Sequence, residues 1–158
     1  MGAAPTGFRR PGDIVTEPST DRSGPRASFG RRLLALLLDS ILLGVVGAIL
    51  VFLVGDVAGQ GLNILIGAGY FIALEGSPSG QTVGKRALGI RVLDLDAGGP
   101  VGYGRAVIRY VGRFVSGIVF ALGYLWMLWD GQKQTWHDKM ATTVVVPTSA
   151  YPVESWPG

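Results

Sequence analysis

The feature that most constrains the fold is an apolar block near the start of the chain. It runs from Leu33 to Val54 and is interrupted only by Asp39, Ser40 and glycines. At about 1.5 Å per residue, a helix over this block reaches roughly 33 Å, enough to cross a hydrocarbon core of about 30 Å. A soluble domain of 158 residues rarely buries such a helix on all sides. The block therefore predicts an α-helical integral membrane protein.

Two further apolar stretches decide how often the chain crosses the membrane. Leu62 to Leu74 predicts a second span, separated from the first by a short loop over Gly55 to Gly61. Residues 107–129 either cross fully or form a half-crossing that turns back near Gly117 or Gly123. The expected fold therefore has two to three transmembrane helices.

Two β-branched runs predict a small sheet outside the spans. Leu88 to Asp94 precedes a turn-forming segment, and Thr142 to Val146 ends at Pro147. We expect the runs to pair as a small cytoplasmic β-hairpin or sheet element; the alternative is that each is irregular. Pairing requires both runs on one side of the membrane and so favours a half-crossing by residues 107–129, whereas the length of that stretch favours a full crossing. We expect the C-terminus to be cytoplasmic.

Composition divides the chain into three parts. Residues 1–28 are rich in Pro, Gly, Ser, Thr and charge, without an apolar period, which predicts a disordered cytoplasmic tail. Residues 29–147 form the predicted membrane domain, and residues 148–158 form a C-terminal tail.

Lysine and arginine are unevenly distributed along the chain, and their distribution predicts the topology. Six lie in the tail up to Arg32, none lies in residues 55–61, and six lie in residues 77–113. Because cytoplasmic segments carry the excess of basic residues, the tail and the middle region are predicted to face the cytoplasm. We expect a multi-pass protein of the plasma membrane with a cytoplasmic N-terminus and residues 55–61 outside.

The basic residues flank apolar spans instead of forming one soluble face, so we do not expect nucleic-acid binding. A stripe of arginines repeats every four residues along a predicted amphipathic helix from Gly104 to Ile118. Membrane lipids are the expected partners, because basic residues beside a membrane attract anionic headgroups. The residues expected to contact headgroups are Lys85, Arg86, Arg105, Arg109 and Arg113.

The composition argues against several classes of chemistry. The chain has no cysteine and a single histidine, His137, so disulfides and thiolate or multi-histidine metal sites are excluded. We predict no metal, no cofactor and no enzyme activity, because no nucleophile and acid can be assigned to His137. Gly80 to Lys85 resembles a phosphate loop, but Ser79 and Arg86 replace the required glycine and hydroxyl residue, so ATP binding is not predicted.

Asp39 is the most informative single residue, since it lies well inside an apolar helix. A carboxylate there costs about 2.5 to 3.5 kcal/mol on insertion scales and needs a partner, a watery cavity or a proton. It is either an ion, proton or substrate site or a polar anchor for helix packing. Arg32 lies seven residues earlier on nearly the same helix face. It is either an ion-pair partner of Asp39 or an anchor at the headgroups.

Together these residues resemble the RDD family of small bacterial membrane proteins, named for one arginine and two aspartates. Arg32, preceded by Phe29 and Arg31, and Asp39 match its first helix. Its Gly-x-Thr-x-Gly-Lys-Arg stretch and following strand appear as Gly80 to Arg86 and Ile90 to Asp94. Its closing block appears as His137, Asp138, Ala141, Thr143, Val145 and Val146. The resemblance covers residues 26–147 and identifies Asp138 as the second aspartate.

The resemblance implies no defined molecular function, although transport of a ligand and ion–proton exchange have been suggested for the family. One hypothesis is transport of an ion or small solute at Asp39, in a homo-oligomer because two or three helices cannot enclose a pathway. The other is a non-transporting accessory or scaffold protein, within a larger membrane complex or docked on anionic lipid. The motif residues are Arg32, Asp39 and Asp138, with supporting residues His137, Gly84, Lys85, Arg86, Arg109 and Arg113.

Overall fold

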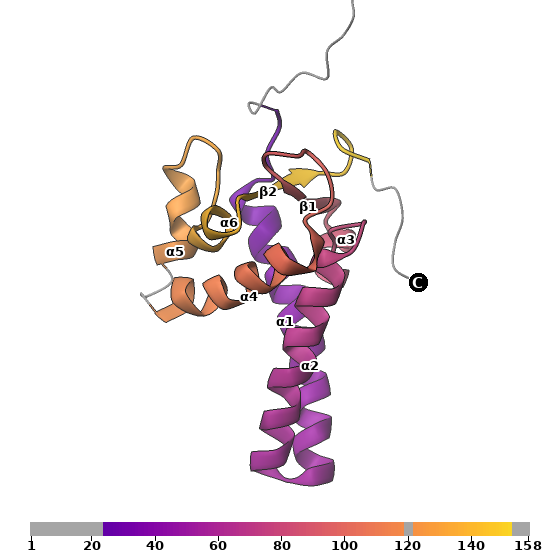
Figure 1. The fold of residues 1–158 in the computed structure, drawn as a ribbon. Coiled ribbons are helices and arrows are strands. Elements are labelled where there is room, and N and C mark those ends of the chain that lie inside the picture. Colours follow the sequence, from indigo (N-terminus) through magenta and orange to yellow (C-terminus); the bar gives the residue numbers. More distant parts are fainter. Residues whose placement is uncertain (1–23, 119–121, 153–158) are drawn as a thin grey trace, which may run out of the picture.

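The computed structural model describes residues 24–118 and 122–152. Most of the predicted N-terminal tail and the last six residues of the predicted C-terminal tail lie outside these described residues. The described chain forms a long helical hairpin that carries a cap at one end (Figure 1). Here the cap means the described residues outside the hairpin, which are residues 24–28, 77–118 and 122–152.

The hairpin consists of α1 (Phe29–Val54) and α2 (Asp56–Gly76), both long and apolar enough to cross a membrane. The Ser28 side chain caps α1 by accepting a hydrogen bond from the Arg31 amide. The predicted loop over residues 55–61 is wrong, because Gly55 alone connects the helices. Its φ of 86° suits glycine, and Asp56 places a negative charge at the start of α2, where the helix dipole favours it.

The end of the hairpin away from the cap exposes apolar side chains almost everywhere. Residues 37–54 of α1 make about 27 Å of helix, close to the thickness of a hydrocarbon core. The two helices approach closely at Gly47, where an added Cβ would lie 2.6 Å from the Asn63 side chain. Large exposed side chains include Ile41, Val45, Ile49, Phe52, Leu53, Val57, Ile64 and Leu65. Such a surface is suited to lipid, and the predicted helical membrane fold is confirmed.

The predicted strand pairing is also confirmed. β1 (Ile90–Asp94) and β2 (Thr143–Pro147) form a two-stranded antiparallel sheet in which Val92 lies opposite Val145. The amide of Ala27 donates to the Val145 carbonyl at 2.9 Å, so the segment before α1 joins the same unit. One full crossing by residues 107–129 would put β1 and β2 on opposite sides of a bilayer, which their pairing does not allow.

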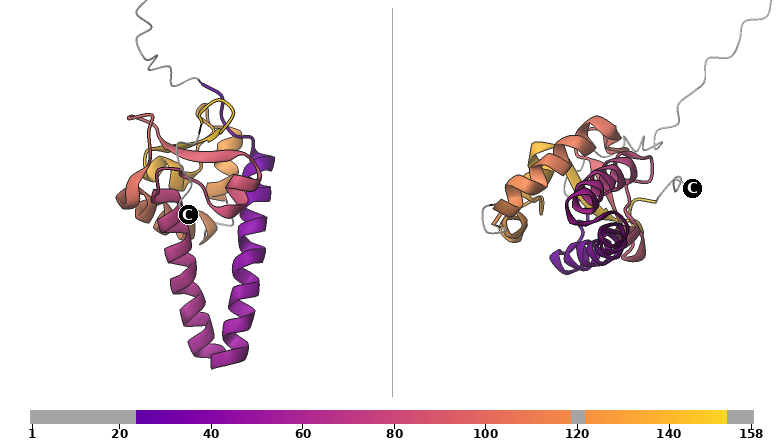
Figure 2. Two further views of the ribbon diagram at one scale, coloured as in Figure 1. Left: turned by 90° about the vertical axis from the view of Figure 1, so that its right-hand side faces the viewer. Right: turned by 90° about the horizontal axis from the view of Figure 1, so that it is seen from below.

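Residues 102–118 and 122–128 form helices that turn instead of one straight span. α4 (Gly102–Ile118) runs crosswise to the hairpin, as both views in Figure 2 show together with Figure 1. After it come α5 (Leu122–Leu125) and the 3₁₀ helix η1 (Trp126–Leu128), bent from α4 by 112°. These helices count as a third span only if the bent pair is taken as one crossing.

The orientation of α4 is opposite to the prediction, which placed its basic residues toward the lipid headgroups. Its inward face carries Ala106, Arg109, Gly112 and Ser116, all buried. Its outward face carries large apolar side chains, including Tyr103, Val107, Val111, Phe114 and Ile118. The arginine stripe therefore faces the protein interior, because the acidic partners Glu75, Asp94 and Asp138 lie there. Arg109 is buried, so its expected position at the outer surface is wrong, and its contact with a headgroup stays a prediction.

Two one-turn helices complete the cap, and each begins with a threonine. Thr82 caps α3 (Val83–Ala87) by accepting from the Lys85 amide. Thr135 caps α6 (Trp136–Met140), where the Asp138 carboxylate also accepts from the Thr135 amide to close a capping box. These caps orient the residues that follow them, and several of those residues belong to the sequence motifs.

Candidate functional site

Asp138 is the centre of a buried ionic network that joins three distant parts of the chain. Nη1 of Arg32 lies 2.6 Å from one carboxylate oxygen, and Nη1 of Arg109 binds the other. The Thr135 amide adds a third hydrogen bond at 3.1 Å. Burial would by itself raise the pKa of Asp138, but the two guanidinium groups outweigh it and hold this pKa well below its usual range. Asp138 is therefore ionised at neutral pH.

Glu75 forms the second half of this network at the end of α2. Its carboxylate is fully buried and binds three cations, which are Lys85, Arg109 and Arg113. Nε of Arg109 lies 3.1 Å from Glu75 while Nη1 of the same side chain binds Asp138. Arg109 therefore bridges the two acids, which a planar guanidinium with several donors can do.

Asp39 lies in a separate polar cluster and is held by three neutral donors. The Tyr70 hydroxyl donates to it at 2.5 Å, the Thr82 hydroxyl at 2.6 Å and the Gly84 amide at 2.7 Å. Within the described residues Arg32 pairs with Asp138 and not with Asp39, so the hypothesis of an Arg32–Asp39 ion pair is wrong. A carboxylate satisfied by three donors anchors α1 to Tyr70 of α2 and to the segment that supplies Thr82 and Gly84.

The loop that resembles a phosphate loop thus binds the protein's own carboxylate. Gly84 is required there because a Cβ would collide with the Ala35 carbonyl oxygen and lie 3.0 Å from the Asp39 carboxyl carbon. The next residue, Lys85, extends into the ionic network. Burial lowers the pKa of Lys85 to about 8 even though Glu75 acts to raise it.

His137 lies beside the network and is neutral. Its two ring nitrogens face the hydroxyl groups of Ser116 at 3.2 Å and Thr135 at 3.0 Å. Burial lowers the pKa of His137 to about 3, and the nearby arginines act in the same direction. The ring therefore fixes α6 against α4 through hydrogen bonds, without carrying charge at neutral pH.

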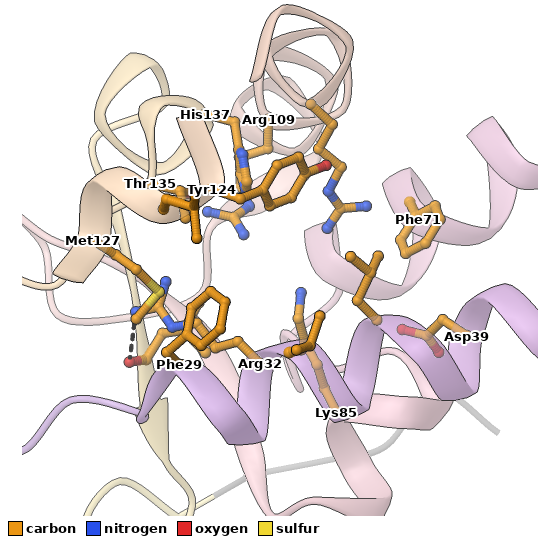
Figure 3. Close-up of a pocket in the computed structure, with 15 residues that line it drawn as sticks. Phe29, Arg32, Asp39, Phe71, Lys85, Arg109, Tyr124, Met127, Thr135 and His137 are labelled. Carbon is orange, nitrogen blue, oxygen red and sulfur yellow. Dashed lines mark hydrogen bonds between the residues drawn. The ribbon is translucent and has the colours of Figure 1, made fainter. Parts of the chain in front are cut away.

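A cavity of about 370 Å³ lies between the first turns of α1 and the α4–α5 region. Figure 3 shows Lys85 and Arg109 reaching toward it from opposite sides, with Phe29, Tyr124 and Met127 around it. Its volume is at the lower end of the range for small-molecule sites, roughly 300 to 1,000 Å³. The polar lining consists of Arg32, Asp39, Lys85, Arg109, Arg113, Tyr124, Thr135 and His137.

The structure brings most of the sequence-predicted residues to this cavity and its network. Asp138 contacts the lining through Arg32 and Arg109, and Gly84 contacts it through Asp39. Arg86 is exposed and does not line the cavity. The sequence analysis missed Glu75, Tyr70 and Thr82 as site residues. An acid within an apolar segment was the available signal for Glu75, whereas no spacing rule pointed to the two hydroxyls.

A comparison with known protein families identifies the family of this chain. A model of the RDD family matches residues 26–142, which include all three residues of the motif. The chain belongs to the RDD family. No solved structure gives a significant match.

The chain also matches bacterial proteins. It is 40% identical over 68 residues to the proline-rich antigen homolog of Mycobacterium tuberculosis and 36% identical over 69 residues to the proline-rich antigen of Mycobacterium leprae. These matches cover 43% and 44% of this chain but only 28% of each mycobacterial protein. The chain is 28% identical over 147 residues to uncharacterized protein YxaI of Bacillus subtilis, covering 76% of this chain and 96% of that protein.

Proposed function

We propose that this RDD protein is a non-transporting accessory protein of the plasma membrane. The hairpin anchors it, and the cap presents a rigid surface at the cytoplasmic face for a larger membrane complex. The observation that carries this proposal is the environment of Asp39, whose carboxylate is already satisfied by Tyr70, Thr82 and Gly84. An acid used in this way holds the fold and has no free position for a transported ion.

The rest of the ionic network supports the same proposal. Glu75 and Asp138 are buried and bound by arginine and lysine side chains, so neither is available to a passing cation. Breaking such a pair strands a buried charge, which makes a repeated cycle of binding and release costly. Transport at Asp39 in a homo-oligomer remains the competing function that the experiment below must test.

The proposal also excludes an enzymatic role for the Ser116–His137 contact. Ser116 is fully buried, and an added Cβ at Gly123 would lie 2.7 Å from it, so this part of the cap is tightly packed. A histidine whose pKa is about 3 is a poor general base at neutral pH. Both features fit a structural hydrogen bond better than a nucleophile and its base.

Two observations support the orientation of the protein in the membrane: the distribution of its basic residues and the apolar outward face of α4. The basic residues of the first turn of α1 and of residues 77–113 belong to one end of the molecule, so the positive-inside rule places that end in the cytoplasm. The apolar outward face of α4 suits the boundary between headgroups and acyl chains, where amphipathic helices lie in the membrane plane. Lipid is then the immediate partner of the cap.

The decisive experiment measures flux in proteoliposomes. Purified wild-type protein and Asp39→Asn are reconstituted, and Na⁺, K⁺, Li⁺ and proton movements are followed beside protein-free vesicles. We expect no flux above the protein-free level from either protein and a lower unfolding temperature for the variant. Cation flux by the wild type that is lost in a variant of unchanged unfolding temperature would favour transport over the accessory role.

A further inference from the structure

The cavity described above carries one more positive than negative charge. Four cations line it, namely Arg32, Lys85, Arg109 and Arg113. The carboxylates that line or contact this group are Asp39, Glu75 and Asp138. His137 adds no charge at neutral pH. One monovalent anion would therefore balance the charge around the cavity.

Two buried donors that belong to residues lining the cavity lack partners among the described residues. They are Nε of Arg32 and Nη1 of Arg113. A buried N–H without an acceptor is costly, and two of them beside one cavity call for a ligand with several acceptor oxygens. Arg113 is further held by its stacking over the Phe71 ring at 4.1 Å, so its guanidinium is positioned before any ligand binds.

The remaining lining is apolar and comes largely from the start of α1. Phe29, Leu33 and Leu36 line it there, and Leu125 and Met127 line it from the α5–η1 segment. Below this level the hairpin exposes the surface suited to lipid. The cavity thus combines a cationic side with an apolar side at the boundary between cap and membrane span.

We propose that this cavity binds one phosphate group, carried by a membrane lipid headgroup or by free inorganic phosphate. Arginine recognises phosphate through paired N–H donors, and the lysine adds a point charge. Burial is the main cause of the lowered pKa of Lys85, and Arg113 and Arg109 lower it further. The inference rests on the proposed accessory role and adds the class of ligand that the cap binds. Ion flux and phosphate binding are measured in separate experiments, so one proposal can be contradicted without the other.

The first test uses delipidated protein in a neutral detergent and inorganic phosphate, with chloride at equal ionic strength as the reference. We expect saturable binding by calorimetry at one site per chain and a higher unfolding temperature. Arg113→Gln should weaken binding by about tenfold or more, since a charge-assisted contact is lost. Lys139→Gln is the matched control, because it removes the same charge from an exposed pair outside the cavity and should leave binding unchanged.

The second test identifies the source of the phosphate by native mass spectrometry from mixed micelles. The micelles contain phosphatidic acid, phosphatidylglycerol or phosphatidylcholine in separate samples. Retention of one anionic lipid per chain, lost on adding inorganic phosphate and in Arg113→Gln, would assign the site to a lipid headgroup. Binding of inorganic phosphate without lipid retention would assign it to the free anion.

Three results would overturn the inference. One is wild-type protein that shows no saturable difference between phosphate and chloride and retains no lipid. Another is binding that Arg113→Gln and Lys139→Gln weaken equally. If Arg113→Gln does not fold, Lys85→Gln takes its place, and unchanged binding in that variant would also remove the cavity as the site.

Discussion

Arg32 in α1 and Asp138 in α6 form an ion pair of 2.6 Å although 106 residues separate them in the sequence. Through this pair the start of the first membrane helix is tied to the end of the cap. Asp39, only two turns further along α1, takes no part in the pair and binds α3 instead. The two clusters meet at α3, where Gly84 contacts Asp39 and Lys85 contacts Glu75.

The first prediction concerns Asp138. Asp138→Asn should lower the free energy of unfolding by about 3 to 5 kcal/mol, because it leaves Arg32 and Arg109 buried beside a neutral partner. Adding Arg32→Gln should recover part of that loss. Thermal unfolding in detergent measures both, with Asp130→Asn as a control, since Asp130 binds two loop amides and the half-exposed Lys139, and no buried cation is stranded by the change. Equal losses for the two aspartate variants would contradict the network.

The second prediction concerns Asp39. Asp39→Asn should destabilise the protein by about 2 kcal/mol, because an amide cannot accept all three hydrogen bonds without presenting a donor to another donor. Tyr70→Phe should cost less, about 1 kcal/mol, since it removes one of the three. Arg32→Gln should not rescue Asp39→Asn. Clear rescue in a double-mutant cycle would show that Arg32 and Asp39 interact after all.

The sequence predicted the elements well because their signals are local. The length of the apolar block around Asp39 predicted a span, and the β-branched run ending at Val146 predicted a strand without any tertiary information. The loop after Val54 was misjudged because glycines and an aspartate are as common at a helix start as in a loop. A single glycine was enough to reverse the chain.

The partners within the site could not be predicted, because pairing depends on how helices meet. Arg32 and Asp39 share a helix face, and that proximity suggested a pair, yet the docking of α6 gave Arg32 a closer acid. The spacing of the arginines in α4 correctly placed them on one face of the helix. It did not show that this face packs against the protein instead of facing lipid headgroups. Arg109 faces inward because Glu75 lies at the end of α2 and Asp138 lies in α6, which no periodicity reveals.

The third prediction tests the contact between α3 and α1. Gly84→Ala should destabilise the protein by about 1 to 3 kcal/mol, because its methyl group would displace the Ala35 carbonyl or the Asp39 carboxylate. Gly44→Ala is the matched control, since an added Cβ there meets nothing within 4 Å. Unfolding temperatures of the two variants in detergent measure this loss of stability. Similar values for both would show that α3 does not pack as closely as described.

The fourth prediction concerns topology. Single cysteines at Ala58 and Ser149 can be labelled specifically because the chain has no cysteine of its own. A membrane-impermeant thiol reagent should label Ala58→Cys in intact cells and Ser149→Cys only after lysis, since the sheet holds the C-terminal strand in the cap. Labelling of both in intact cells would require a third crossing. The reverse pattern would place the cap outside.

The fifth prediction is a pH dependence set by His137. Its pKa is about 3 in the folded protein and near 6.5 when unfolded, so between these values the unfolded chain binds more protons. The free energy of unfolding should therefore fall as the pH drops below about 6.5, by up to about 1.4 kcal/mol per unit. The contribution of Asp138 stays present above about pH 3.8, so the interval from 6.5 to 5 reports on His137.

Unfolding temperatures at pH 7.5, 6.0 and 5.0 measure this dependence in the wild type and in His137→Gln. Glutamine offers a donor and an acceptor to Ser116 and Thr135 but takes up no proton. We expect the variant to be less stable at pH 7.5, because the ring packing is lost, and to change little as the pH falls. If both proteins lose stability in parallel, another group carries the dependence, and the neutral His137 described above is wrong.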